Sequence, residues 1–140
     1  MNTVNEIMQS ASLLGACNKS NEISDWKSLV WLFFTPQGRE FCEENNFPSL
    51  EQFRGMDGGI ADYGVLVDAG RISLENEEKI ALIGNTDAEL SFTDNAKVHK
   101  VILMHGATAH IVASNYVVLL IVNIGNCKVI TDKDETVVIL

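Results

Sequence analysis

Residues 84–126 decide the fold, and they read GNTDAELSFTDNAKVHKVILMHGATAHIVASNYVVLLIVNIGN. Turn-forming residues recur about every ten positions here, and short runs rich in β-branched and aliphatic residues lie between them. The turns, including one more with the same spacing, are Gly84-Asn85, Asp94-Asn95, His105-Gly106, Ser114-Asn115, Gly125-Asn126 and Asp134-Glu135. This regular spacing predicts an all-β structure built from short strands.

A second period of about twenty residues is nested in the first. The corners that carry it are Gly64, Gly84, His105 and Gly125 in one series and residues 92–95, 112–115 and 131–134 in another. A fixed period with polar corners is typical of a solenoid, in which each coil of about two strands stacks on the last. A meander or a β-sandwich such as a jelly roll would share the shorter spacing, and the longer register makes us favour the solenoid.

Two segments in this half are almost wholly apolar. Val117 to Val122 does not alternate with polar residues, which predicts a strand buried on both faces. The tail from Thr136 to Leu140 is similarly apolar and would promote aggregation if it formed a free sheet edge. We therefore expect N-terminal helices or another subunit to cover these segments, and we expect a homo-oligomer.

Residues 1–60 have a helical pattern and are expected to pack on or cap the β region. Val4, Ile7, Met8, Ala11 and Leu14 form one apolar stripe on a first helix. A second helix begins after Ser24, and its aromatic residues, Trp26 and Trp31 among them, are typical of a core at this spacing.

Two further helices are predicted by their capping residues. Thr35-Pro36 opens a helix from Pro36 to Glu44, with Phe41 and Cys42 facing inward and Asn45-Asn46 at its end. Ser49 and Gln52 have the spacing of a capping box, which opens a short helix that ends near Gly55.

Asp57-Gly58-Gly59 separates the helical region from the β region, residues 61–140. Beyond it, two short strands, residues 65–67 and 72–74, flank Asp68-Ala69-Gly70, which we interpret as a hairpin-like turn. The predicted fold class is α+β, with the two regions forming one cooperative unit.

The net charge of -9 and the absence of any Lys or Arg cluster exclude whole classes of partner. A nucleic-acid partner or an anionic membrane surface would need a basic footprint, so neither is expected. Leu14 to Cys17 resembles a lipoprotein cleavage site, but Met1 to Ser10 lacks the basic start and apolar run of a signal peptide. With three unpaired cysteines, Cys17, Cys42 and Cys127, the sequence predicts a cytoplasmic protein with reduced thiols.

The histidines His99, His105 and His110 lie close together in sequence and are the candidates for a metal site. They lack a further ligand at a suitable spacing, so we expect His105 at a corner and His110 on a strand face. Whether the three approach one another is not determined by the sequence. Nothing in the sequence orients a cysteine toward an imidazole, so Cys–His catalysis is not predicted either.

The remaining candidate site residues are carboxylates. Asp87 and Glu89 would share one strand face, and Asp132 and Asp134 another, an arrangement that a carbohydrate-binding or carbohydrate-active protein could use. Acidic residues at turns are, however, ordinary solvated corners. Residues 84–87 lack the lysine and the following helix of a phosphate loop, and residues 132–135 lack the spacing of a calcium loop.

Residues 31–42, WLFFTPQGREFC, and residues 105–109, HGATA, resemble a family of small uncharacterised proteins from gut Bacteroidetes. These proteins are often associated with prophages or other mobile regions. The resemblance implies a bacterial origin and supplies no activity, cofactor or catalytic residue.

The sequence therefore predicts a non-enzymatic assembly or interaction module of bacterial or phage origin, which self-associates through apolar β surface and could also take a protein partner. The competing hypothesis is the carbohydrate-directed one. No catalytic, cofactor-binding or metal-binding residue is assigned.

Overall fold

The computed structural model describes residues 6, 7, 9, 30, 34–56 and 58–140. The chain divides into two compact units, Met1–Val65 and Leu66–Leu140, and each is described by itself. The two predicted helices before residue 34, with Trp26 and Trp31, fall almost entirely outside the described residues, as does Cys17.

In the first unit, helix α3 runs from Pro36 to Asn45 as its caps predict. The Thr35 hydroxyl accepts a hydrogen bond from the Gly38 N–H at 3.0 Å, which satisfies a donor at the helix start. Asn46, in the left-handed conformation at φ 49°, ends the helix. Cys42 faces inward and is buried, and the Phe41 ring meets Phe47 edge-on at 5.7 Å between centroids.

Helix α4 spans Leu50–Arg54 and has the predicted capping box, in which the Gln52 N–H donates to Ser49 Oγ at 3.1 Å. A 3-10 helix, η2, follows at Gly58–Tyr63. The sequence does not predict η2, because a short 3-10 helix held by local hydrogen bonds has too few residues to show a helical period.

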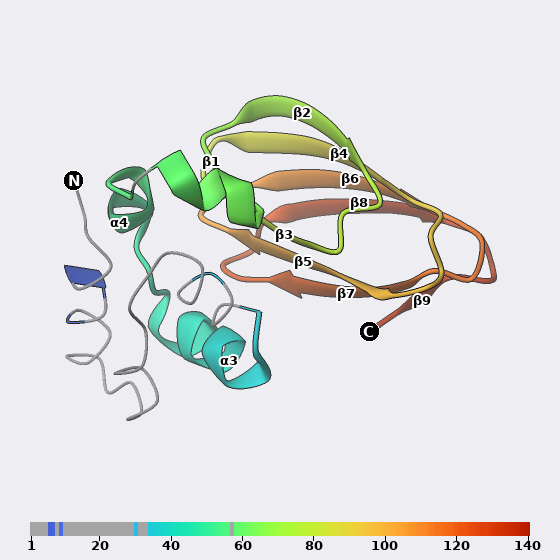
Figure 1. Ribbon diagram of the computed structural model, residues 1–140, viewed down its shortest axis with the longest axis horizontal. Helices are drawn as coiled ribbons and strands as arrows, with labels where there is room; N and C mark the ends of the chain where they lie inside the picture. Colours follow the sequence, from blue (N-terminus) through green and yellow to red (C-terminus); the bar gives the residue numbers. More distant parts are fainter. Residues whose placement is uncertain (1–5, 8, 10–29, 31–33, 57) are drawn as a thin grey trace. The chain divides into compact units, whose positions relative to one another are not determined.

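The second unit is a β-solenoid in which consecutive strands alternate between two sheets (Figure 1). One sheet has the order β1-β3-β5-β7-β9 and the other β2-β4-β6-β8. The strands are β1 Val65–Val67, β2 Gly70–Glu75, β3 Lys79–Ile83, β4 Thr86–Phe92, β5 Val98–Met104, β6 Thr108–Ala113, β7 Val118–Asn123, β8 Lys128–Lys133 and β9 Val138–Ile139. The prediction of a solenoid with two strands per coil is confirmed, and the sandwich alternative is wrong.

The strand register carries the period seen in the sequence. Val98 on β5 aligns with Val118 on β7 and Val138 on β9, a step of 20 residues each time. The step from β3 to β5 is 21 residues, since Lys79 aligns with Lys100, and the first step in the other sheet is 16, from Gly70 to Thr86. All of these pairings are parallel.

Corner residues in the left-handed conformation turn the chain from one sheet to the other. Gly84, His105 and Gly125 have φ of 67°, 57° and 82°, and they occupy equivalent corners of successive coils. His105 shows that this corner does not require glycine, because histidine is among the residues that tolerate positive φ.

Asp68-Ala69-Gly70 is a solenoid corner, and our interpretation of it as a hairpin turn was wrong. The flanking strands β1 and β2 belong to different sheets. The corner is bonded forward to the next coil instead: the Asp68 N–H donates to the Ile83 carbonyl at 3.0 Å, and Asp68 Oδ1 accepts from the Asn85 N–H at 2.8 Å.

The core of the second unit lies between the two sheets. Alternate residues of every central strand point into it, as strand geometry requires. Its fully or almost fully buried members are Ile80, Leu82, Ala88, Leu90, Phe92, Val101, Leu103, Ala107, Ala109, Ile111, Ala113, Val117, Leu119, Cys127 and Val137.

Candidate interaction surface

The two sheets present outward faces of opposite character. On the four-stranded sheet the outward residues are mostly polar, and they form columns across the strands, in register from coil to coil. One column is Arg71, Asp87, Thr108 and Lys128, and the next is Ser73, Glu89, His110 and Ile130. Asp87 and Glu89 therefore share one exposed face of β4, as predicted.

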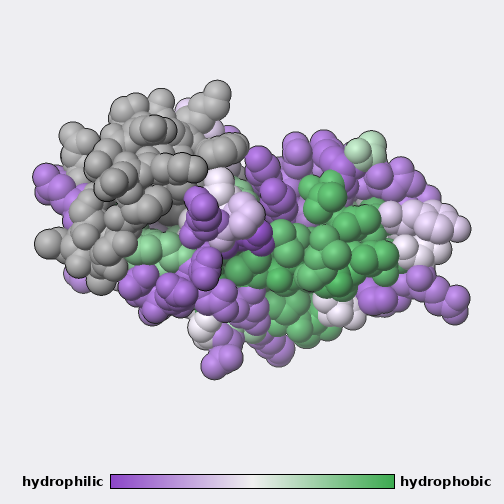
Figure 2. All heavy atoms as spheres, turned by 90° about the horizontal axis from the view of Figure 1, so that it is seen from below, coloured by the Kyte–Doolittle hydropathy of each residue, from purple (hydrophilic) through white to green (hydrophobic). Residues whose placement is uncertain are grey.

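The five-stranded sheet carries an apolar surface on β5, β7 and β9. Its partly exposed residues, which we call the apolar face, are Val98, Val118, Leu120, Val122, Val138 and Leu140. Val98 is 42% exposed, Val138 50% and Leu140 65%. Figure 2 shows hydrophobic residues gathered on this side of the solenoid. Contiguous apolar surface of this kind is typical of a contact site.

Charge is nearly absent from this part of the sheet. Lys100 is the one charged residue at the outward positions of β5, β7 and β9, and none of these positions holds a carboxylate. The chain as a whole has 19 acidic residues, so an acid-free strip across three strands is a local departure from its composition. A second acidic molecule could approach this strip without close carboxylate–carboxylate repulsion.

Within a single chain β7 is buried on one face, and the expected cover of its other face by another subunit stays a prediction. Leu119 is fully buried in the core, whereas Val118, Leu120 and Val122 on the outward side are half-buried. In the tail, Ile139 packs against the core and Val138 faces outward. The two apolar segments can be recognised in the sequence, whereas Val98 is placed beside them only by the strand register.

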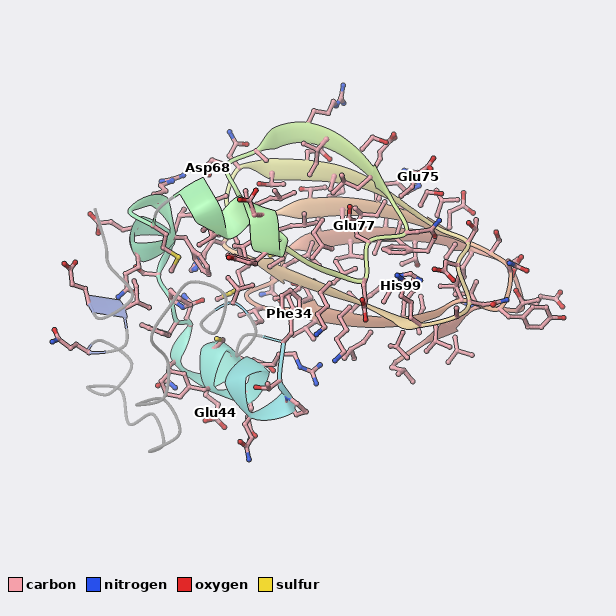
Figure 3. The ribbon with its side chains drawn as sticks, viewed as in Figure 1. Phe34, Glu44, Asp68, Glu75, Glu77 and His99 are labelled. Carbon is pink, nitrogen blue, oxygen red and sulfur yellow. The ribbon has the colours of Figure 1, made fainter. Side chains whose placement is uncertain are left out.

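The three candidate histidines occupy unrelated environments. His105 lies at a corner and His110 on the outward face of β6, both as expected. His99 is fully buried between the sheets (Figure 3). Among the described residues, no group of three or more His, Cys, Asp or Glu side chains is placed to hold a metal ion.

Both ring nitrogens of His99 face backbone carbonyls. Nδ1 lies 2.8 Å from the Glu77 oxygen and Nε2 lies 2.7 Å from the Asp94 oxygen. A neutral imidazole can donate to only one of them, whereas a doubly protonated ring donates to both. The ring also packs on Phe92, with 4.8 Å between centroids. His99 therefore ties the corner before β3 to the corner before β5.

Asp134 braces a third corner, after β8. It accepts hydrogen bonds from the N–H and the hydroxyl of Thr136, at 2.9 and 2.5 Å, and the same hydroxyl accepts from the Tyr116 N–H of the preceding coil at 3.0 Å. The Thr136 hydroxyl, more than any other group, lowers the pKa of Asp134. Asp134 thus has a structural role that Asp132 on β8 does not share. The carbohydrate hypothesis stays a prediction.

The described cysteines are buried thiols. Cys127 Sγ donates to the Ile124 carbonyl at 3.5 Å, and burial raises the pKa of Cys42 from 9.0 to about 12. A thiol must ionise to act as a nucleophile. The burial of Cys42 therefore does not activate its sulfur.

We expect Cys42 to resist thiol reagents in the folded protein. The raised pKa lowers the thiolate fraction at pH 8 on the order of 1,000-fold relative to an ordinary thiol. The measurement is the rate of reaction with Ellman's reagent in a C17S/C127S variant, with and without denaturant. Labelling of the folded protein as fast as that of the denatured chain would contradict this expectation.

In the portion that the structure describes, no helix has the length and apolar character needed to cross a membrane. No protein family model, curated protein or solved structure matches the chain. The surfaces and sites above are therefore interpreted from their own geometry.

Proposed function

We propose that the protein is a non-enzymatic assembly module whose copies associate through the apolar face. The observation that carries the proposal is the acid-free apolar strip across β5, β7 and β9 in a chain of net charge -9. A second copy of the chain is the partner that presents a matching apolar strip. A twofold contact would set the two strips against each other and remove both from water.

The proposal includes a cytoplasmic location and a bacterial or phage origin. The buried thiols Cys42 and Cys127 are compatible with a reducing compartment. The origin is supported by the resemblance of residues 31–42 and 105–109 to small Bacteroidetes proteins of mobile regions.

Val138→Gln is expected to weaken the association about 10–100-fold. In a twofold contact Val138 is buried twice, and covering the exposed half of each valine contributes roughly 0.7–1.3 kcal/mol, so the loss is about 1.4–2.7 kcal/mol for the dimer. The measurement is a dilution series in sedimentation velocity ultracentrifugation.

Val112→Gln is the matched control. Val112 is 46% exposed against 50% for Val138, and it lies on the outward face of β6 in the other sheet. Association should be unchanged in this variant. Wild-type protein that stays a monomer at every concentration, or equal effects of the two substitutions, would refute the proposal.

A further inference from the structure

Among the described strands, β8 in one sheet and the two-residue β9 in the other each have one edge with no partner strand, and one layer of the core beside them is partly exposed. Strand β8 pairs with β6 on one side, and no described strand pairs with its other side. Val129 and Ile139 belong to the core but are only partly buried, and Ile130 on the outward face is 48% exposed. An open strand edge is a template for pairing with another chain.

The free edge of β8 has its hydrogen-bonding groups at defined residues. The Asp134 N–H points toward β6, since it donates to the Ala113 carbonyl at 3.4 Å. The backbone N–H and C=O groups of successive residues point to opposite edges of a strand. The groups of Val129 and Thr131 therefore point away from β6, toward the free edge.

From this edge we infer that β8 of one copy pairs with β8 of a second copy as antiparallel strands about a twofold axis. If this axis is perpendicular to the sheet, the outward faces of the two copies lie on the same side of the joined sheet. Ile130 then lies opposite Ile130 of the second copy. Val129 then exchanges both backbone hydrogen bonds with Thr131, and the Ile130 pair takes the closer spacing of a pair without hydrogen bonds.

Charge complementarity selects this register. With Ile130 at the centre, Lys128 lies opposite Asp132 of the second copy, and Asp132 lies opposite its Lys128. All three side chains are on the outward face and exposed. Moving the axis by one residue, to Thr131, would set Ile130 against Asp132 and Val129 against Lys133, which matches apolar side chains with charges.

Head-to-tail stacking is disfavoured by the same columns. Continuing the coil order would set β8 of one copy beside β2 of the next. Lys128 would then adjoin Arg71, and Asp132 would adjoin Glu75, because these residues occupy the same columns. Like charges directly opposite each other on adjacent strands are destabilising. Two copies therefore meet at their C-terminal coils, which also covers Val129 and Ile139.

This inference rests on the proposed self-association and adds a second contact to it. With both contacts present, the wild-type assembly should exceed twice the chain mass of 15.4 kDa. Breaking the β8 contact should leave the smaller species held by the apolar face, and combining that change with Val138→Gln should give the monomer.

Charge exchange within β8 tests the inference. K128D sets aspartate against aspartate, and D132K sets lysine against lysine, so each should weaken the edge contact at least tenfold in sedimentation velocity. K128D/D132K restores the opposite-charge pairs and should recover association to within about threefold of wild type. R71D, the same change in the same column on β2, should have no effect.

A backbone variant tests the strand pairing itself. T131P removes an N–H that points to the free edge, so the ladder with β6 stays intact while the contact between copies is lost. Far-UV circular dichroism checks that the variant is folded. Unchanged mass in K128D, D132K and T131P would overturn the inference, and so would failure of the double exchange to restore association. If Val138→Gln reduced the mass of the assembly and none of the β8 variants did, the β8 contact would be refuted and the apolar-face proposal would be supported.

Discussion

Leu103→Ala is expected to lower the free energy of unfolding of the solenoid by about 2–5 kcal/mol. Leu103 is fully buried and lies at the inward position of β5, in register with Leu82 on β3. Shortening it removes apolar contacts and leaves a cavity that the sheets on either side cannot close. Urea unfolding followed by far-UV circular dichroism measures the change.

The position of Leu103 within the stack adds to the effect. In a solenoid each coil is stabilised by its own core and by its contacts with the coils on either side. Strand β5 lies between β3 and β7, so a cavity there weakens two coil–coil contacts. Among the described strands β8 pairs only with β6, so Val129→Ala would weaken one coil–coil contact, and it also removes fewer atoms, so V129A should cost less.

Leu120→Ala is the matched control for this prediction. Leu120 is the same residue type on the neighbouring strand β7, but it points outward and is half-buried. At a protein concentration low enough to keep the chain monomeric, its substitution should cost less than half as much as that of Leu103. Equal losses at the two sites would mean that the core does not lie between the two sheets.

The coil period could be predicted from the sequence because corners restrict residue choice. A left-handed backbone favours glycine and asparagine, and here Gly84 and Asn115 have φ of 67° and 65°. Polar side chains at the corners also bond between coils, as when Asn115 Nδ2 donates to the Thr93 carbonyl at 2.9 Å. Both requirements recur once per coil, so they leave a period in the sequence.

The path of the chain at Asp68 could not be predicted in the same way. Aspartate and glycine suit a hairpin turn as well as a solenoid corner. The choice between them depends on partners far along the chain, such as the Asn85 N–H that donates to Asp68 Oδ1. Turn chemistry alone therefore located the bend and gave the wrong strand pairing.

The apolar face was only partly visible in the sequence. The unbroken apolar run on β7 does not indicate which of its side chains point outward. The alignment of Val98, Val118 and Val138 on neighbouring strands identifies them. The charge pattern on β8 was hidden for a different reason. Lys128 and Asp132 resemble ordinary surface residues until β8 is seen to be the outermost described strand of its sheet.

His99→Leu is expected to lower the free energy of unfolding by about 2–5 kcal/mol, although leucine is the more apolar residue. The ring occupies a fully buried site, and its two nitrogens face the carbonyls of Glu77 and Asp94. Leucine can donate to neither carbonyl, and a buried polar group left without its hydrogen bond costs about 1–3 kcal/mol, to which the poorer fit of leucine at this buried site adds. Urea unfolding again gives the loss.

Two further variants separate the hydrogen bonds of His99 from its packing. His99→Gln keeps an amide donor for at least one carbonyl and should be more stable than His99→Leu. His110→Leu makes the same substitution on the outward face of β6 and should change stability by less than about 0.5 kcal/mol. If His99→Leu were as stable as the wild type, the carbonyl contacts would contribute nothing to the fold.

Hydrogen exchange locates the effect within the structure. The N–H groups of Thr93 and Asp94 donate to Asn76 Oδ1 at 2.7 and 3.1 Å, at the same pair of corners that His99 joins. If the imidazole holds these corners together, both amides should exchange faster in His99→Leu. Exchange of the amides in the centre of β6 should change only as much as the global stability changes. If amide exchange instead became faster uniformly across the solenoid, the loss of stability would come from altered packing against Phe92, a contact that leucine preserves only in part.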